Sequence, residues 1–201
     1  MIKGANKKKC IISLSGHMAI YNTVSDVTIT CEDPQLSGLI NVYMIGDTAL
    51  LKNCIIEGVN VIVGNEENKL NSHGKSIEIL PNDPSNQHLN KERLISSCIF
   101  KGNGSIEVSG SSSLTIQLSR VESIPGIIVK DRASCQLIQV GLEKSSVSVQ
   151  ENARFIANQN TIFKNSEYGI VASGNSELEL NTVVFKNISD RAISCFEKCE
   201  I

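Results

Sequence analysis

Tryptophan is absent from the chain, and only three Tyr and five Phe occur among its 201 residues. Sugars stack on aromatic faces, so we expect little surface for a polysaccharide. Charge of one sign is also lacking, because 19 Lys and Arg stand against 21 Asp and Glu. Nucleic acid and anionic membranes attract strongly basic surfaces, and a membrane span needs ~18 consecutive apolar residues that no stretch approaches. We therefore predict neither a nucleic-acid nor a membrane partner.

The cysteines lack the close, repeated spacing of a zinc ribbon or a redox motif. They are seven, an odd number, at positions 10, 31, 54, 98, 135, 195 and 199. Cys195 and Cys199 could pair or bind a metal, although two ligands alone do not make a structural zinc site. The first residues also lack the apolar region of a secretory signal. We expect reduced, mostly structural thiols in a cytoplasmic protein, with no cofactor and no metal.

A large apolar residue followed by a charge returns about every 21 positions. Its members are Phe100, Val121, Leu142, Phe163 and Phe185, at steps of 21, 21, 21 and 22. A fixed period of this size indicates a solenoid. An earlier member, Ile56, lies 44 residues before Phe100, which suggests one irregular or expanded coil between the two.

Apolar residues alternate with polar ones over short runs within each period, which is typical of strands and not of helices. Two further columns repeat at steps of 20 to 23. They comprise Ile106, Ile127, Val147, Ile170 and Ile193 in one, and Leu114, Cys135, Phe155 and Leu178 in the other. Three short strands per period predict an all-β fold, a single-stranded parallel β-helix of about eight coils. Leucine-rich repeats are excluded because their helical half is absent, and left-handed β-helices because the steps do not keep a hexapeptide rhythm. We therefore predict a right-handed solenoid.

Asparagine and serine precede the strands that carry the first column. Asn53, Asn160 and Asn181 stand there, with Ser97 and Ser119 in the same place. Such side chains tolerate left-handed turns and can stack as a hydrogen-bonded ladder. We expect a ladder of this kind along one turn of the solenoid.

These repeated elements resemble those of the right-handed parallel β-helix, or pectin-lyase-like, superfamily over roughly residues 27 to 196. The residues that carry the resemblance are Asn53–Ile56, Asn160–Phe163, Gly169–Val171 and Asn181–Phe185. The resemblance implies one of two functions. The superfamily contains extracellular polysaccharide lyases and hydrolases, and also eukaryotic intracellular modules that bind proteins or build cytoskeletal and ciliary assemblies. The chain is more similar to the non-catalytic modules.

An enzyme of this superfamily acts with clustered carboxylates, or with acidic calcium ligands beside a basic residue. Asp131 and Glu151 are 20 residues apart at the ends of equivalent strands, and Arg132 and Arg154 lie near them. Carboxylates on neighbouring coils would be ~5 Å apart, the separation that retaining glycosidases use. A surface ladder of paired charges explains the same pattern, and we favour it. Asp131, Glu151 and Arg132 are therefore the candidates of the alternative hypothesis, a polysaccharide lyase or glycoside hydrolase.

The chain reads as one domain, residues 1–201, with three irregular parts. Residues 1–26 form an N-terminal cap or a first irregular coil, with Ile11, Ile12 and Leu14 turned inward. Residues 64–93 form an expanded coil around a strand candidate at residues 76–80, and residues 185–201 form a last coil without a cap. A β-helix exposes apolar core and strand edges at an end that nothing covers.

Interaction with other proteins is therefore our first functional hypothesis. We predict a non-catalytic scaffold in a larger cytoplasmic assembly, with the cytoskeleton as one candidate assembly. Its partner binds the last coil or the 64–93 segment, and a second copy of the chain is an alternative partner. The interaction candidates are Ile193, Phe196, Ile201, His73 and His88.

Overall fold

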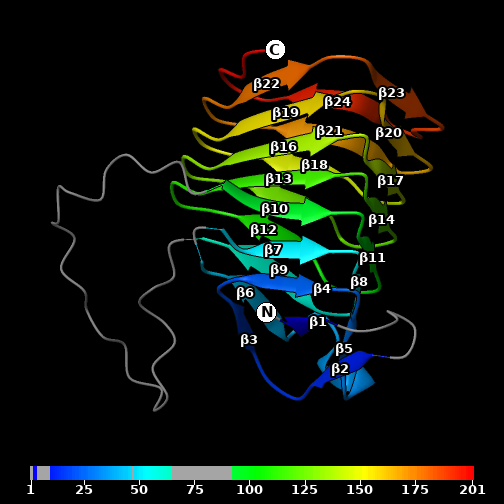
Figure 1. Ribbon diagram of the computed structural model, residues 1–201. Coiled ribbons are helices and arrows are strands. Elements are labelled where there is room, and N and C mark those ends of the chain that lie inside the picture. Colours follow the sequence, from blue (N-terminus) through cyan, green and yellow to red (C-terminus); the bar gives the residue numbers. More distant parts are fainter. Residues whose placement is uncertain (1, 4–9, 47, 65–91) are drawn as a thin grey trace, which may run out of the picture.

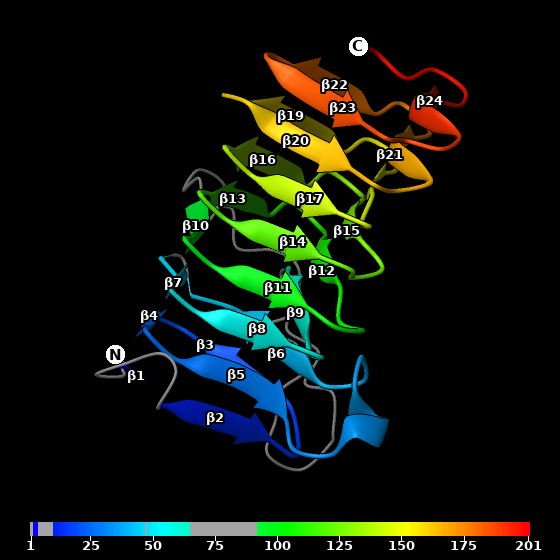
Figure 2. The ribbon, with the colours of Figure 1, turned by 90° about the vertical axis from the view of Figure 1, so that its right-hand side faces the viewer.

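The computed structural model describes residues 2–3, 10–46, 48–64 and 92–201, and these form a parallel β-solenoid. Three sheets of eight strands each run the length of the molecule, and the chain climbs from the N-terminus at one end to the C-terminus at the other (Figure 1). Successive strands pass from the front sheet of Figure 1 to the right-hand side, which faces the viewer in Figure 2, and then to the back. The solenoid is therefore right-handed, and the predicted fold class is confirmed.

Each sheet contains every third strand of the chain. Sheet 1 comprises β1 (Ile2–Lys3), β4 (Thr23–Ser25), β7 (Leu50–Lys52), β10 (Glu92–Ser96), β13 (Ser113–Gln117), β16 (Ser134–Ile138), β19 (Arg154–Asn158) and β22 (Glu177–Leu180). Sheet 2 comprises β2 (Ile11–Leu14), β5 (Thr28–Cys31), β8 (Ile55–Glu57), β11 (Ile99–Lys101), β14 (Arg120–Glu122), β17 (Gly141–Glu143), β20 (Thr161–Lys164) and β23 (Val183–Lys186). Sheet 3 comprises β3 (Met18–Ile20), β6 (Asn41–Met44), β9 (Asn60–Val63), β12 (Ile106–Val108), β15 (Ile127–Val129), β18 (Val147–Val149), β21 (Tyr168–Ala172) and β24 (Arg191–Cys195). A short 3₁₀ helix, Pro34–Leu36, follows β5.

The core consists of the three predicted columns. Phe100, Val121, Leu142, Phe163 and Phe185 are direct register partners along sheet 2. The other two columns pair in the same way along sheets 3 and 1. Most of these side chains are completely buried. Burial of a continuous apolar stack, one layer per coil, stabilises the fold, because each coil covers the apolar residues of the next.

The interval between Ile56 and Phe100 has a different explanation from the predicted one. These two residues are paired directly, β8 against β11, so no coil lies between them. The additional residues belong to one connection, between β9 and β10, and Glu92 and Arg93 already belong to β10. The strand candidate at 76–80 lies outside the described residues.

The described N-terminal residues include strands β1 to β4, which pair within the three sheets. Ile12 pairs with the buried Ile29. Ile11 is 61% exposed, contrary to the expectation that it turns inward, because neighbouring residues of a strand point to opposite faces.

Most turns between sheets repeat a residue with positive φ. In the turn from sheet 1 to sheet 2, Asn53, Ser97 and Asn160 occupy this position, as predicted. The prediction is wrong for Ser119, which lies one residue further on and points inward, where its hydroxyl accepts a hydrogen bond from the Cys98 N–H at 3.1 Å. It is also wrong for Asn181, because Thr182 has the positive φ there.

In the turn from sheet 1 to sheet 2, the Asn53 amide donates to Asp26 Oδ1 of the neighbouring coil at 3.2 Å, as a ladder requires. Side-chain amides also stack in the next turn, from sheet 2 to sheet 3. The Asn187 amide donates to Asn165 Oδ1 at 3.0 Å, and the Asn165 amide donates to Glu143 Oε1 at 3.2 Å. These bonds join three neighbouring coils on the surface.

Candidate functional site

The C-terminal end of the solenoid leaves core positions partly open. We define the end face as the inward side chains of the last coil, which are Leu180, Val183, Phe185, Ile188 and Ile193. All five are half-buried and pack against the core on one side. Their equivalents one coil below, such as Phe163 and Ile170, are completely buried. The difference arises because the last coil has a neighbour on only one side.

Phe185 is the largest side chain of the end face. Its ring stacks on Phe163, with centroids 5.0 Å apart and an angle of 20° between the planes. Gly169 leaves room for it, because a Cβ at that position would lie 2.6 Å from the Phe185 ring. The ring therefore lies flat across the core and presents its other side outward.

The strand edges of the last coil differ between the sheets. At sheet 1, Glu200 forms a bridge with Glu177 on β22, and Leu178 N–H donates to Glu200 O at 2.8 Å. Within the described part of the chain, β23 and β24 have no strand beyond them. The C-terminal residues thus begin a further coil over sheet 1 and leave the other two sheets with a free edge.

The predicted interaction residues lie around this end, at the top of Figure 1. Ile193 belongs to the end face, whereas Phe196 and Ile201 follow it and are 51% and 74% exposed. His73 and His88 lie outside the described residues. The end face members Leu180, Val183, Phe185 and Ile188 were not among the interaction candidates, although Phe185 is the last member of the 21-residue column.

Charges border the end face on the sheet 1 side. Arg154 pairs with Glu179 at 2.9 Å and lies 3.7 Å from Glu177. These side chains line a cavity of about 270 Å³ together with Glu200 and Ile201. On the sheet 3 side, a hydrogen bond with Asp190 raises the pKa of Tyr168. The apolar end face therefore has a polar border.

The alternative catalytic candidates occupy the turn from sheet 3 to sheet 1. Asp131 and Glu151 have the same position on neighbouring coils, each with positive φ. Asp131 Oδ2 accepts a hydrogen bond from the Gly110 N–H at 2.7 Å, so this carboxylate binds the backbone of the coil below. Arg132 is exposed and lines a groove of about 470 Å³ with Arg154 on the outer face of sheet 1. Neither Asp131 nor Glu151 is among the residues that line this groove.

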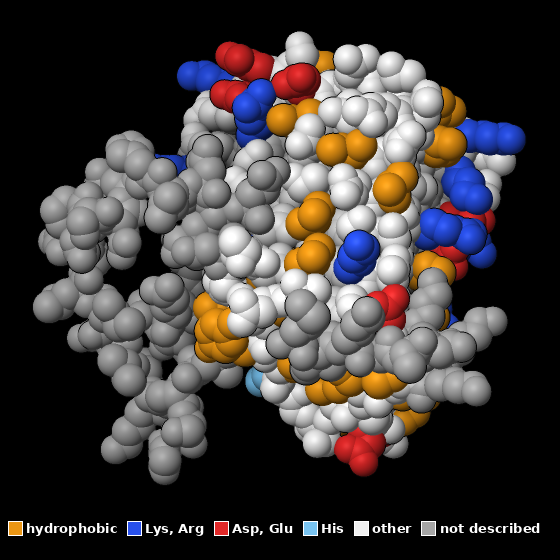
Figure 3. Space-filling model, viewed as in Figure 1, with side chains coloured by type: hydrophobic (Ala, Val, Ile, Leu, Met, Phe, Trp, Pro, Cys, Tyr) orange, Lys and Arg blue, Asp and Glu red, His pale blue; other side chains and the backbone are white. Residues whose placement is uncertain are grey.

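The outer face of sheet 1 has few charged side chains across its middle. Figure 3 shows uncharged and apolar side chains there, with charges gathered toward the sides and the C-terminal end. Thr115, Gln136 and Ile156 are among the groove residues. On the described part of this face, carboxylates and a basic residue come together at the C-terminal end, where Arg154 pairs with Glu177 and Glu179, and not at Asp131 or Glu151.

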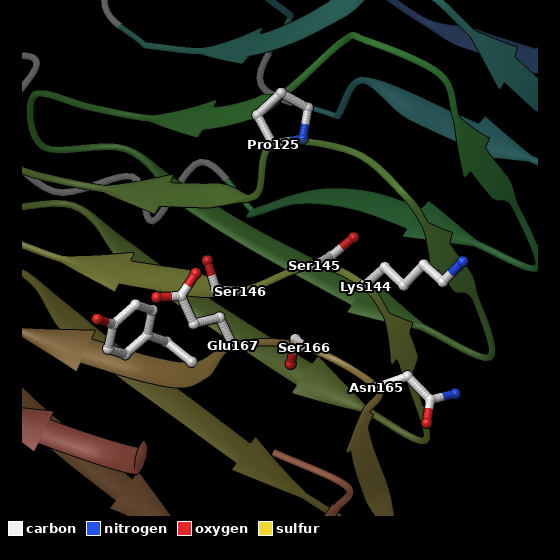
Figure 4. Close-up of a pocket in the computed structure, with 8 residues that line it drawn as sticks. Pro125, Lys144, Ser145, Ser146, Asn165, Ser166 and Glu167 are labelled. Carbon is white, nitrogen blue, oxygen red and sulfur yellow. The ribbon is translucent and has the colours of Figure 1, made fainter. Parts of the chain in front are cut away.

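A second cavity, of about 290 Å³, lies along the turn from sheet 2 to sheet 3. It is lined by Lys144, Asn165, Glu167 and several serines (Figure 4). In Figure 4 the Lys144 and Glu167 side chains extend in opposite directions. The serine hydroxyl at position 145 accepts from Ile124 N–H and donates to Glu143 O, so it is occupied by the turn backbone. Ser145 is therefore not free to act as a nucleophile.

Cys54 and Cys98 are buried side by side, and all seven thiols are free. Cys54 N–H donates to Cys98 Sγ at 3.4 Å. The hydrogen bond with Cys54 and burial raise the pKa of Cys98. Burial also raises the pKa of Cys135, to about 12. Cys98 and Cys135 are therefore protonated at neutral pH, and all three core thiols are buried.

Among the described residues, no group of three or more His, Cys, Asp or Glu is arranged to hold a metal ion. A search of the same residues finds no helix with the length and apolar character to cross a membrane.

Comparisons with protein-family models, with curated proteins and with solved structures gave no match. The site that the structure distinguishes from the rest of the solenoid is therefore the end face.

Proposed function

We propose that this chain is a non-catalytic β-helix scaffold that binds another protein through its C-terminal end face. The observation that carries the proposal is the half-exposure of five apolar core residues beside the free edges of β23 and β24. Free backbone N–H and C=O groups beside apolar side chains favour addition of strands from a second polypeptide. The backbone bonds would supply affinity, and the polar border would set the register.

A place in a larger cytoplasmic assembly, of the cytoskeletal or ciliary kind, is part of this proposal. The shape supports it, because a straight stack of coils ends in two faces that can continue the stack. In this respect the chain is closer to the non-catalytic modules of the β-helix superfamily than to its secreted lyases. A second copy of the chain is the first partner to test. The strands of its coils have the same spacing as the strands that would pair with β23 and β24 at the end face.

The test compares charged substitutions at and away from the end face. Phe196→Asp and Ile201→Asp change exposed residues beside the end face, so both variants should fold. Leu118→Asp is the matched control, because Leu118 is 57% exposed in the middle of the solenoid and has a positive φ that Asp tolerates.

Sedimentation velocity over a wide concentration range, followed by cross-linking in native extract, measures the outcome. We expect association of the wild type and of Leu118→Asp, and its loss in the other two variants. A wild-type chain that stays monomeric at every concentration, and whose cross-links in extract avoid residues 177–201, would refute the proposal.

A further inference from the structure

Two cysteines at the C-terminal end lie in contact across one turn. Cys199 Sγ donates a hydrogen bond to Cys195 Sγ at 3.0 Å. Cys195 ends β24 and is exposed, and Cys199 is half-buried and packs against the core. The pair is therefore both close and accessible, in contrast to the buried Cys54 and Cys98.

The repeat of the solenoid explains this contact. Cys195 continues a core column of sheet 3 above Ala172, Val149 and Val129. Cys199 precedes the bridge residue Glu200 and so lies above Ser176, in the inward column of the following turn. In the last five turns from sheet 3 to sheet 1 the two columns are four residues apart, with a positive-φ residue midway; at the last coil this residue is Glu197.

The same turn thus brings together Val129 with Ala133, Val149 with Ala153 and Ala172 with Ser176 in the coils below. All six of these residues are buried. Only at the last coil are both positions cysteine. The contact between the thiols follows from a turn that also occurs in four coils below, with Gly110, Asp131, Glu151 and Gly174 midway, and not from a chance meeting of chain ends.

We propose that Cys195 and Cys199 are a redox site that forms an intrachain disulfide when the protein meets a hydroperoxide. One of the two thiols gives up its proton and, as the thiolate, attacks one peroxide oxygen, so that an S–O bond forms, the O–O bond breaks, and the leaving oxygen takes up a proton to depart as an alcohol or water. The other sulfur then attacks the resulting sulfenic acid. The S–S bond forms, the S–O bond breaks, and hydroxide takes the proton of the second thiol and leaves as water. Two thiols lose two electrons, which the peroxide receives.

Exposure distinguishes this pair from the core thiols. Cys195 is exposed, whereas Cys54, Cys98 and Cys135 are buried. Desolvation, together with the contact with Cys199, raises the pKa of Cys195 to about 11, so this thiol is mostly protonated at neutral pH.

The disulfide would hold the C-terminal residues in the path that they already follow. Phe196 N–H donates to Ala172 O, Lys198 N–H to Gly174 O, and Glu200 N–H to Ser176 O, at 2.9, 3.2 and 3.0 Å. A covalent link between Cys195 and Cys199 would fix the turn that carries these hydrogen bonds. Its effect on partner binding at the end face rests on the proposed function, whereas formation of the disulfide does not.

The experiment treats the purified full chain with hydrogen peroxide, blocks free thiols with an alkylating reagent, and maps the peptides by mass spectrometry. We expect the loss of two free thiols, a peptide linked between Cys195 and Cys199, and recovery of both thiols with a reductant. Cys54 and Cys98 are the internal control, because their burial should leave them reduced. In Cys195→Ser, a sulfenic-acid probe should label Cys199.

Hydrogen exchange at Leu178 measures the structural effect, since its N–H donates to Glu200 O. Oxidation should slow this exchange in the wild type and leave it unchanged in Cys195→Ser. If both thiols remain alkylatable after peroxide, or if they link only to other chains, the proposal is wrong. If the disulfide forms but partner binding does not change, the redox site is supported, and only its effect on binding at the end face is refuted.

Discussion

Replacing Phe163 with Ala removes a ring from the middle of the sheet 2 column. Phe163 is completely buried between Leu142 and Phe185. Core Phe→Ala substitutions cost about 3–5 kcal/mol, the sum of lost transfer free energy and the cavity that remains. Phe185→Ala is the matched comparison. Its half-buried ring contacts the core on one side only, so about half of that cost is expected.

Urea unfolding followed by circular dichroism measures the free energy of unfolding of each variant. Because repeat proteins can lose cooperativity between coils, hydrogen exchange of β20 and β23 should accompany it. We expect Phe163→Ala to lower the stability of the whole array, and Phe185→Ala chiefly to release the last coil. Equal costs for the two variants at low protein concentration would contradict the description of an open C-terminal end.

Three further perturbations test the turns. Gly104→Ala should prevent or strongly impair folding, because the added Cβ would lie 2.0 Å from a backbone oxygen, whereas Gly141→Ala, with nothing within 4 Å, should fold normally in the same thermal melt. The hydrogen bond with Lys164 lowers the pKa of the Glu143 carboxyl. The stability that this bond contributes should be present above the pKa of Glu143 in the unfolded chain, and it should disappear as the pH falls through the pKa of Glu143 in the folded chain. An NMR titration of Glu143 should show a midpoint below 4.5, and a normal midpoint would contradict the bond. Asp131→Ala should lower the free energy of unfolding by about 1 kcal/mol, because it removes the acceptor of the Gly110 N–H, and Asp131→Asn should lower it less. If the wild type instead cleaves a polyuronate and Asp131→Ala does not, the result would favour an enzyme.

The columns could be predicted from the sequence because each of their positions obeys one strong constraint. An inward position between two coils must be apolar, so Phe100, Val121 and Leu142 recur at a constant step. Strand alternation then decides which neighbours face outward. Where the constraint weakens, at Ile11 on the first strand of sheet 2, the expectation failed.

The structure of the interval between Ile56 and Phe100 could not be predicted from the repeat. Its length is close to two periods, but a connection between strands lengthens at little free-energy cost. A periodic argument cannot separate an added coil from an added loop when the lengths agree. Only the direct pairing of β8 with β11 does so.

Turn residues were harder to place because the left-handed backbone accepts more residue types than its preferences suggest. Leu118, Gln139 and Lys144 all have positive φ, although none is a typical turn residue. The backbone hydrogen bonds of the neighbouring coils impose the conformation, and the side chain adapts to it. An asparagine in the sequence therefore marks the region of a turn without marking its left-handed position.

The same reasoning separates the two functional hypotheses. Carboxylates at equivalent positions of adjacent coils look like a catalytic pair, yet the position of Asp131 and Glu151 is held by glycine in the coils on either side, at Gly110 and Gly174. What these four residues share is a positive φ and not a charge. Selection for the turn is therefore enough to explain the pair, and a solenoid will produce such pairs wherever acidic residues fall in the same column. At the end face the inward positions are apolar as in the coils below, and the last described coil leaves their side chains half-buried.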